Sequence, residues 1–130
     1  MRQLKIFGAT LLTFSLLDGL WLGWVAPDFY QAQIGFVMAD QPNWLAAAIF
    51  YFLFIALLIY FAVLPKLSLS AKHVLLSGAL FGLATYGTYE LTNKAVLANW
   101  PWTIVLVDIA WGIFLCSLSA WAGWYIAQRK

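Results

Sequence analysis

Three acidic side chains stand inside long apolar stretches of this sequence: Asp18, Glu90 and Asp108. An ionisable side chain at the bilayer centre costs at least about 2.5 kcal/mol, so such residues usually face a bundle interior or a cavity. Two carboxyl groups in an apolar pocket can divide the roles of general acid and general base. They can also hold a polar group of a ligand, relay protons, or join helices through a buried network.

Each of the two aspartates is followed three residues later by a tryptophan, Asp18 by Trp21 and Asp108 by Trp111. This spacing places an indole near each carboxylate on a helix, where the indole N–H can donate a hydrogen bond. The pattern has only two fixed positions, so its specificity is low.

A third polar stretch surrounds Glu90. Tyr86 precedes Glu90 by four residues, and Tyr89 precedes Asn93 by four, so each pair shares a helix face. Glu90 and Lys94 have the order and spacing that favour an ion pair. The predicted ligand-binding set is therefore Asp18, Trp21, Tyr86, Tyr89, Glu90, Asn93, Lys94, Asp108 and Trp111.

The composition places these residues in a membrane protein. Of 130 residues, 65% are hydrophobic and 9% are charged, whereas soluble domains carry about 25% charged residues. A soluble chain this short cannot bury so much apolar surface. The net charge of +2 and the absence of a basic stripe argue against nucleic-acid binding. The single cysteine, Cys116, and the lack of Cys/His spacing predict no metal site, and no cofactor motif is present.

Four stretches approach the length of about 20 mostly apolar residues that a membrane helix needs. An unpaired backbone is not tolerated in lipid, so helices are the expected spanning form. The sequence predicts one all-α transmembrane domain, residues 1–130, built as a bundle of four transmembrane helices at about 4–25, 44–64, 72–93 and 102–128. Pro27 and Pro65 should end the first two of these helices.

Basic residues predict the orientation. The loop 26–43 contains Asp28 and Asp40 but no Lys or Arg. Lys and Arg gather at both chain ends and between the second and third spans: Arg2, Lys5, Lys66, Lys72, Arg129 and Lys130. Cytoplasmic loops are the ones enriched in these residues, so we expect both termini in the cytoplasm of a multi-pass protein of the bacterial inner membrane. Trp24, Trp44, Trp100 and Trp102 should then form the outer aromatic belt.

This topology brings polar side chains to one depth. Asp18 and Asp108 fall roughly 10 Å below the outer boundary, Tyr86 reaches the same level, and Glu90 is shallower. We expect them to share one interior chamber in the outer leaflet. The loop 26–43 is either a short amphipathic helix on the membrane surface or a disordered loop, and we favour the helix.

Two further residue pairs receive simpler interpretations. Gly78 and Gly82 form a Gly-x-x-x-Gly face, for which we expect plain helix packing. Tyr51 and Tyr60 on the second span are predicted to face lipid or to pack against neighbours rather than to bind a ligand.

Three strings resemble the DUF2177 family of bacterial membrane proteins: Asp18-Gly-Leu-Trp-Leu-Gly, Gly82-Leu-Ala-Thr-Tyr-Gly-Thr-Tyr-Glu-Leu-Thr-Asn93 and Asp108-Ile-Ala-Trp-Gly. The resemblance covers nearly the whole chain, and the second string is the most specific. It implies a small multi-span membrane protein and does not imply an activity.

Four functions remain open at this stage. The favoured one is binding of a membrane lipid or small hydrophobic ligand in a pocket lined by carboxylates and aromatic side chains. The second is an intramembrane lipid-modifying enzyme that uses Asp18 and Asp108, with Glu90 as a third catalytic candidate. The third is proton-coupled transport, which would need a homo-oligomer because the inner half lacks matching acids. The fourth is a purely structural polar network.

Overall fold

The computed structural model describes residues 1–129, and these residues form helices and no strand. Lys130, one of the predicted cytoplasmic charges, lies outside the described residues. The elements are α1 (Arg2–Leu20), η1 (Trp21–Val25), α2 (Pro27–Ile34), η2 (Gly35–Val37), α3 (Trp44–Leu58), η3 (Ile59–Val63), η4 (Leu64–Lys66), α4 (Ala71–Val96) and α5 (Trp102–Gln128).

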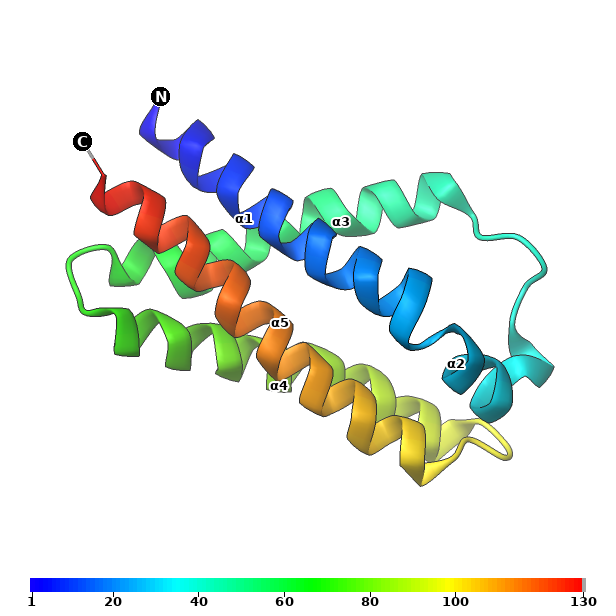
Figure 1. The fold of residues 1–130 in the computed structure, drawn as a ribbon. Helices are drawn as coiled ribbons and strands as arrows, with labels where there is room; N and C mark the ends of the chain where they lie inside the picture. The colour runs from blue at the N-terminus through cyan, green and yellow to red at the C-terminus, as the bar shows by residue number, and fades with distance from the viewer. Residues whose placement is uncertain (130) are drawn as a thin grey trace.

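The long helices are arranged around α5. Figure 1 shows α4 and α5 side by side, with α1 crossing on the other side of α5, and the α4–α5 and α1–α5 contacts are the most extensive. The chain ends and the 67–70 turn lie at one end of the molecule, called here the terminal end. The short helix α2 and the turn before α5 lie at the opposite end, called here the α2 end.

Three helical segments are long and apolar enough to cross a membrane: Arg2–Val25, Trp44–Lys66 and Trp102–Gln128. The 26-residue helix α4 has sufficient length but carries Lys72, His73, Glu90 and Lys94, which lower its hydropathy. Many large apolar side chains on the outside of the molecule are exposed, including Leu16, Leu45, Phe52 and Leu106. Such a surface suits lipid rather than water.

The helix boundaries follow local chemistry. Asn43 caps α3 by accepting a hydrogen bond of 3.0 Å from the amide N of Ala46. Helix α1 passes into a π-helical turn that ends at Val25, and Pro27 occupies the first turn of α2. The segment 26–43 therefore contains the short helix that we favoured, followed by the 3₁₀ turn η2.

Glycines allow α4 and α5 to approach closely. A Cβ atom on Gly82 would lie 2.2 Å from the carbonyl O of Gly112, and one on Gly78 would lie 2.6 Å from the carbonyl O of Cys116. The predicted packing role of Gly78 and Gly82 is therefore confirmed.

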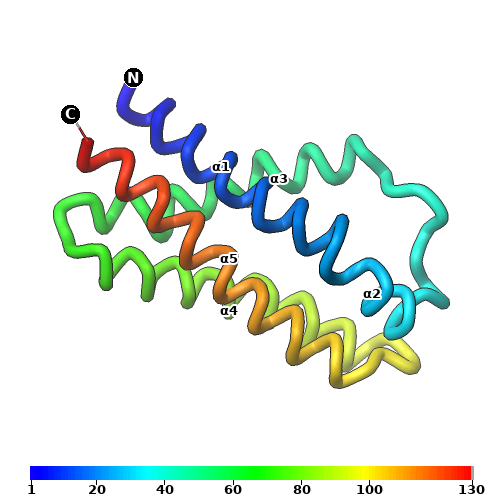
Figure 2. Tube along the Cα trace, viewed as in Figure 1, coloured from blue at the N-terminus to red at the C-terminus, as the bar shows by residue number. Residues whose placement is uncertain are grey.

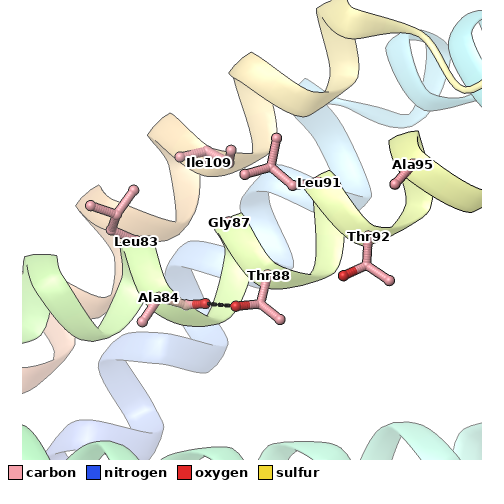
Figure 3. A pocket seen from close by; sticks show the side chains of 8 residues that line it. All are labelled: Leu83, Ala84, Gly87, Thr88, Leu91, Thr92, Ala95 and Ile109. Carbon is pink, nitrogen blue, oxygen red and sulfur yellow. Dashed lines mark hydrogen bonds between the residues drawn. The ribbon is translucent and has the colours of Figure 1, made fainter.

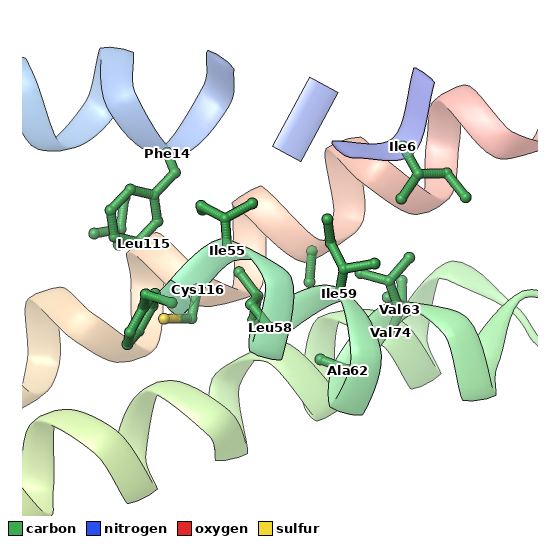
Figure 4. Close-up of a cluster of buried hydrophobic side chains, with 12 residues drawn as sticks. Ile6, Phe14, Ile55, Leu58, Ile59, Ala62, Val63, Val74, Leu115 and Cys116 are labelled. Carbon is green, nitrogen blue, oxygen red and sulfur yellow. The ribbon is translucent and has the colours of Figure 1, made fainter. Parts of the chain in front are cut away.

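The apolar core lies where all four long helices meet. Figure 4 shows Phe14 of α1 and Leu115 of α5 facing Ile55 and Leu58 of α3. Cys116 is buried in the same cluster, where it serves as a small apolar side chain.

Helix α3 joins this core mainly through its C-terminal half. Phe54, Ile55 and Leu58 are buried, whereas Trp44 and Leu45 near its start are each more than 70% exposed. Figures 1 and 2 show the N-terminal half of α3 diverging from α4 and α5 toward the α2 end. This divergence determines where the molecule is hollow.

Candidate functional site

The carboxyl group of Asp18 is buried and accepts two hydrogen bonds from aromatic side chains. The Tyr51 hydroxyl donates to Oδ2 at 2.6 Å, and the Trp111 indole donates to Oδ1 at 3.3 Å. Asp18 is 6% exposed. Tyr51 packs against the core, as expected, and its hydroxyl in addition ties α3 to α1.

The carboxyl group of Asp108 accepts a hydrogen bond from the short helix α2. Tyr30 of α2 donates its hydroxyl proton to Asp108 Oδ1, and the Trp21 indole donates to the Tyr30 oxygen at 2.8 Å. Burial and the Asp108 carboxyl raise the pKa of Tyr30, which lies outside the long helices, so this phenol remains a donor. Helix α2 thus closes the α2 end of the site through the Tyr30 hydroxyl and through the packing of Phe29 and Ile34 on the cluster around Trp100.

Each tryptophan acts on the aspartate of the other helix, and not on the aspartate three residues before it. Trp111 donates to Asp18 on α1, and Trp21 acts on Asp108 through Tyr30. The two indoles stack with ring centroids 4.5 Å apart and planes 10° apart. Because stacking fixes the ring planes between the helices, each N–H points across the interface rather than back along its own helix.

Glu90 is 0% exposed and accepts a hydrogen bond of 2.8 Å from the Trp100 indole at Oε2. Its other oxygen, Oε1, is buried and has no donor among the described residues. Asp108 of α5 is a neighbour of the Glu90 carboxyl, so acids from two helices come close together in the interior.

Trp100 therefore belongs to the site and not to the aromatic belt. It is 3% exposed, whereas Trp24, Trp44 and Trp102 are at least 58% exposed. The belt assignment was wrong for Trp100 because the turn before α5 folds its indole inward onto Glu90.

The expected ion pair between Glu90 and Lys94 does not form. Lys94 Nζ donates to the carbonyl O of Trp100 at 2.7 Å and lies 5.3 Å from the centre of the Trp102 ring. Lys94 extends toward the helix end, where the ammonium avoids the apolar interior. Tyr89 lies beside Asn93 at the edge of the site and is 55% exposed.

A cavity of about 610 Å³ lies between α3 and α4 and reaches Asp108. Its lining is mostly apolar and aromatic: Phe50, Phe54, Ala84, Thr85, Tyr86, Thr88, Tyr89 and Asp108. The hydroxyls of Thr85 and Thr88 bond backbone carbonyls of their own helix. The Tyr86 hydroxyl has no hydrogen-bond partner within residues 1–129, so Tyr86, Tyr89 and Asp108 supply the polar groups of the cavity.

A second hollow of about 520 Å³ lies on the outer side of α4 (Figure 3). Leu83, Leu91 and Ile109 contribute apolar surface, and the hydroxyl of Thr88 bonds the Ala84 carbonyl. This hollow, called here the outer groove, presents no ionisable group. It is a shallow groove of the kind that lipid chains fill.

The predicted set is thus divided between a network and a cavity. Trp21, Trp111, Asp18 and Asp108 belong to one hydrogen-bonded and stacked network, which Tyr30 completes. Glu90 is bonded separately to Trp100, and Asp108 also lines the cavity with Tyr86 and Tyr89. Asn93 and Lys94 lie outside the cavity lining. Among residues 1–129, no group of three His, Cys, Asp or Glu side chains could hold a metal ion.

Sequence reasoning missed five residues of the site: Tyr30, Phe50, Tyr51, Phe54 and Trp100. Tyr51 carried a usable signal, because a hydroxyl in a span without charges needs a partner. Tyr30 and Trp100 lie in connecting segments, whose contacts no helical spacing predicts.

One family model, described as "Predicted membrane protein (DUF2177)", matches residues 3–125. No curated protein and no solved structure matches the chain. The resemblance noted in the three sequence strings is confirmed over almost the full length.

Proposed function

This chain belongs to the DUF2177 family of predicted membrane proteins, and we propose that it binds a membrane lipid or small hydrophobic ligand in the cavity between α3 and α4. One observation carries the proposal: an aromatic cavity of about 610 Å³ ends at a buried carboxyl group, Asp108. Ligand pockets typically measure about 300–1,000 Å³ and combine apolar walls with a few polar groups.

The proposal includes a placement in the membrane. Four spans, with α4 as the third, and cytoplasmic termini put the terminal end inside and the α2 end outside, in a bacterial inner membrane. The cavity then lies in the outer leaflet, where the N-terminal half of α3 diverges from α4. An acyl chain can enter sideways between Phe50 and Tyr89, both of which are exposed and line the cavity.

The arrangement of Asp18 favours binding over acid–base catalysis. Both of its carboxyl oxygens already accept hydrogen bonds, from Tyr51 and Trp111. Asp18 is also absent from the cavity lining. A catalytic pair of Asp18 and Asp108 would need two carboxyls that are both free to contact one substrate. Because the Asp18 carboxyl is already bonded to Tyr51 and Trp111, its role in this proposal is to join α1 to α3 and α5.

Two alanines of α4 allow a matched test. Ala84 and Ala95 both line the outer groove, but only Ala84 also lines the cavity. The purified protein should retain lipid or another apolar molecule that mass spectrometry of an organic extract identifies. Ala84→Trp should lose most of this material, and Ala95→Trp should keep it.

Thermal unfolding in detergent controls for folding of both variants. If Ala84→Trp does not fold, Tyr89→Trp fills the cavity from its exposed edge and serves as the second variant. Equal retention by a folded cavity-filling variant and by Ala95→Trp would contradict the proposal.

A further inference from the structure

The polar end of the cavity presents hydrogen-bond acceptors without a donor, and none of residues 1–129 places a cation there. Among residues 1–129, Asp108 is the only charged residue of the cavity lining, and Glu90 is a close neighbour of Asp108. Lys94, the basic residue of α4 nearest the site, is directed to the Trp100 carbonyl and the Trp102 ring. A negatively charged head group would therefore meet the Asp108 carboxyl without a cation from residues 1–129 to balance its charge.

Apart from the Tyr86 and Tyr89 hydroxyls, the side-chain donors around the acids already have partners. Tyr51 and Trp111 donate to Asp18, Tyr30 donates to Asp108 Oδ1, and Trp100 donates to Glu90 Oε2. Two oxygens lack such a donor within residues 1–129: the second oxygen of Asp108 and the fully buried Oε1 of Glu90. These oxygens retain acceptor capacity, and Asp108 brings it to the lining of the cavity.

The Tyr86 hydroxyl completes this end of the cavity. It lies on the same wall as Asp108, and its ring packs against Gly112, where a Cβ atom would lie 2.2 Å from Tyr86 Cγ. Because Gly112 has no side chain, the Tyr86 ring can pack directly against α5. A phenol hydroxyl can accept from a ligand donor or donate to a ligand oxygen, which suits a small hydroxyl or amine.

From these observations we infer that the ligand is a single-chain amphiphile whose head group donates a hydrogen bond and carries no negative charge, such as a long-chain alcohol or amine. This inference rests on the proposed binding function and specifies its ligand class. The acyl chain occupies the aromatic part of the cavity, and the head group donates to Asp108. Anionic lipids and ionised fatty acids are excluded by charge.

Four photoreactive probes share the same 16-carbon chain and differ in the head group: the alcohol, the amine, the methyl ether and the sulfonate. They separate the effect of a hydrogen-bond donor from the effect of a negative charge. The protein is reconstituted in phosphatidylcholine nanodiscs, and labelled peptides are identified by mass spectrometry. The alcohol or the amine, or both, should label α3 and α4 around Phe50, Phe54 and Tyr86. The ether, which has no donor, and the sulfonate, which is always anionic, should label these peptides at least about tenfold less, the factor that about 1.4 kcal/mol of binding energy produces.

Asp108→Asn should raise labelling by the sulfonate and reduce the preference for the amine, whereas Asp28→Asn, an exposed acid on α2, should change neither. The comparison of probes on the wild type remains decisive if Asp108→Asn does not fold. Equal labelling of the cavity by all four probes would overturn the inference about the head group and leave the binding function intact. Labelling that Ala84→Trp does not reduce would instead defeat the binding function.

Discussion

The hydroxyl of Tyr30 donates a hydrogen bond to the carboxyl of Asp108, which is 78 positions further along the chain. The same hydroxyl accepts from Trp21. One phenol therefore joins α2, the end of the first long helix and α5. The Tyr30 hydroxyl is the polar contact through which the short helix α2 stabilises the α2 end of the molecule, beside the apolar packing of Phe29 and Ile34.

Replacing Tyr30 with phenylalanine should remove both hydrogen bonds and leave the Trp21 indole and Asp108 Oδ1 without this partner. Interhelical hydrogen bonds in membrane proteins contribute about 0.6 kcal/mol on average, so we expect a loss of about 1–2 kcal/mol. Thermal unfolding in detergent measures the loss, and hydrogen exchange should rise in α2. Tyr125→Phe, at a position 39% exposed, is the control and should unfold like the wild type.

Tyr51→Phe should release the N-terminal half of α3, because the hydroxyl of Tyr51 ties this part of the helix to Asp18. Spin labels at Leu45 of α3 and Thr92 of α4 report the separation in a Cys116→Ala background. The distance distribution should become broader and shift to longer values. Tyr60→Phe, at an exposed position of η3, should reproduce the wild-type distribution; a broadening of similar size in both variants would disprove the role of the Tyr51 hydroxyl.

Gly82→Ala should force α4 and α5 apart, because the new Cβ would lie 2.2 Å from the Gly112 carbonyl O. Overpacking of this kind costs about 1–3 kcal/mol. Gly19→Ala meets no atom within 4 Å and should be neutral or slightly stabilising. Unfolding midpoints of the two variants should therefore move in opposite directions or differ clearly, and a shared shift would show that the close approach is not rigid.

The proposed orientation can be tested with single cysteines in the Cys116→Ala background. Asp40 lies between η2 and α3 near the α2 end, and Ser70 lies in the turn before α4 at the terminal end. Asp40→Cys should react with a membrane-impermeant maleimide in intact cells. Ser70→Cys should react only after the cells are opened, and the reverse pattern would place the terminal end outside.

The sequence alone predicted the helical class, the approximate ends of the long helices and a shared level for Asp18 and Asp108. Helix length, proline positions and a fixed rise per residue control these features locally. Gly78 and Gly82 were readable for the same reason, since a Gly-x-x-x-Gly face needs no knowledge of its partner.

Which donors meet which carboxyls follows from the packing of the helices and could not be predicted from spacing. Trp111 bonds the acid of another helix, Trp100 turns inward from a connecting segment, and Lys94 turns away from Glu90. Depth along a helix follows from the sequence, but the rotation of each helix about its axis and the path of the connecting segments follow from packing. The cavity has the same origin: it exists because α3 leaves the bundle at an angle, which no spacing within α3 encodes.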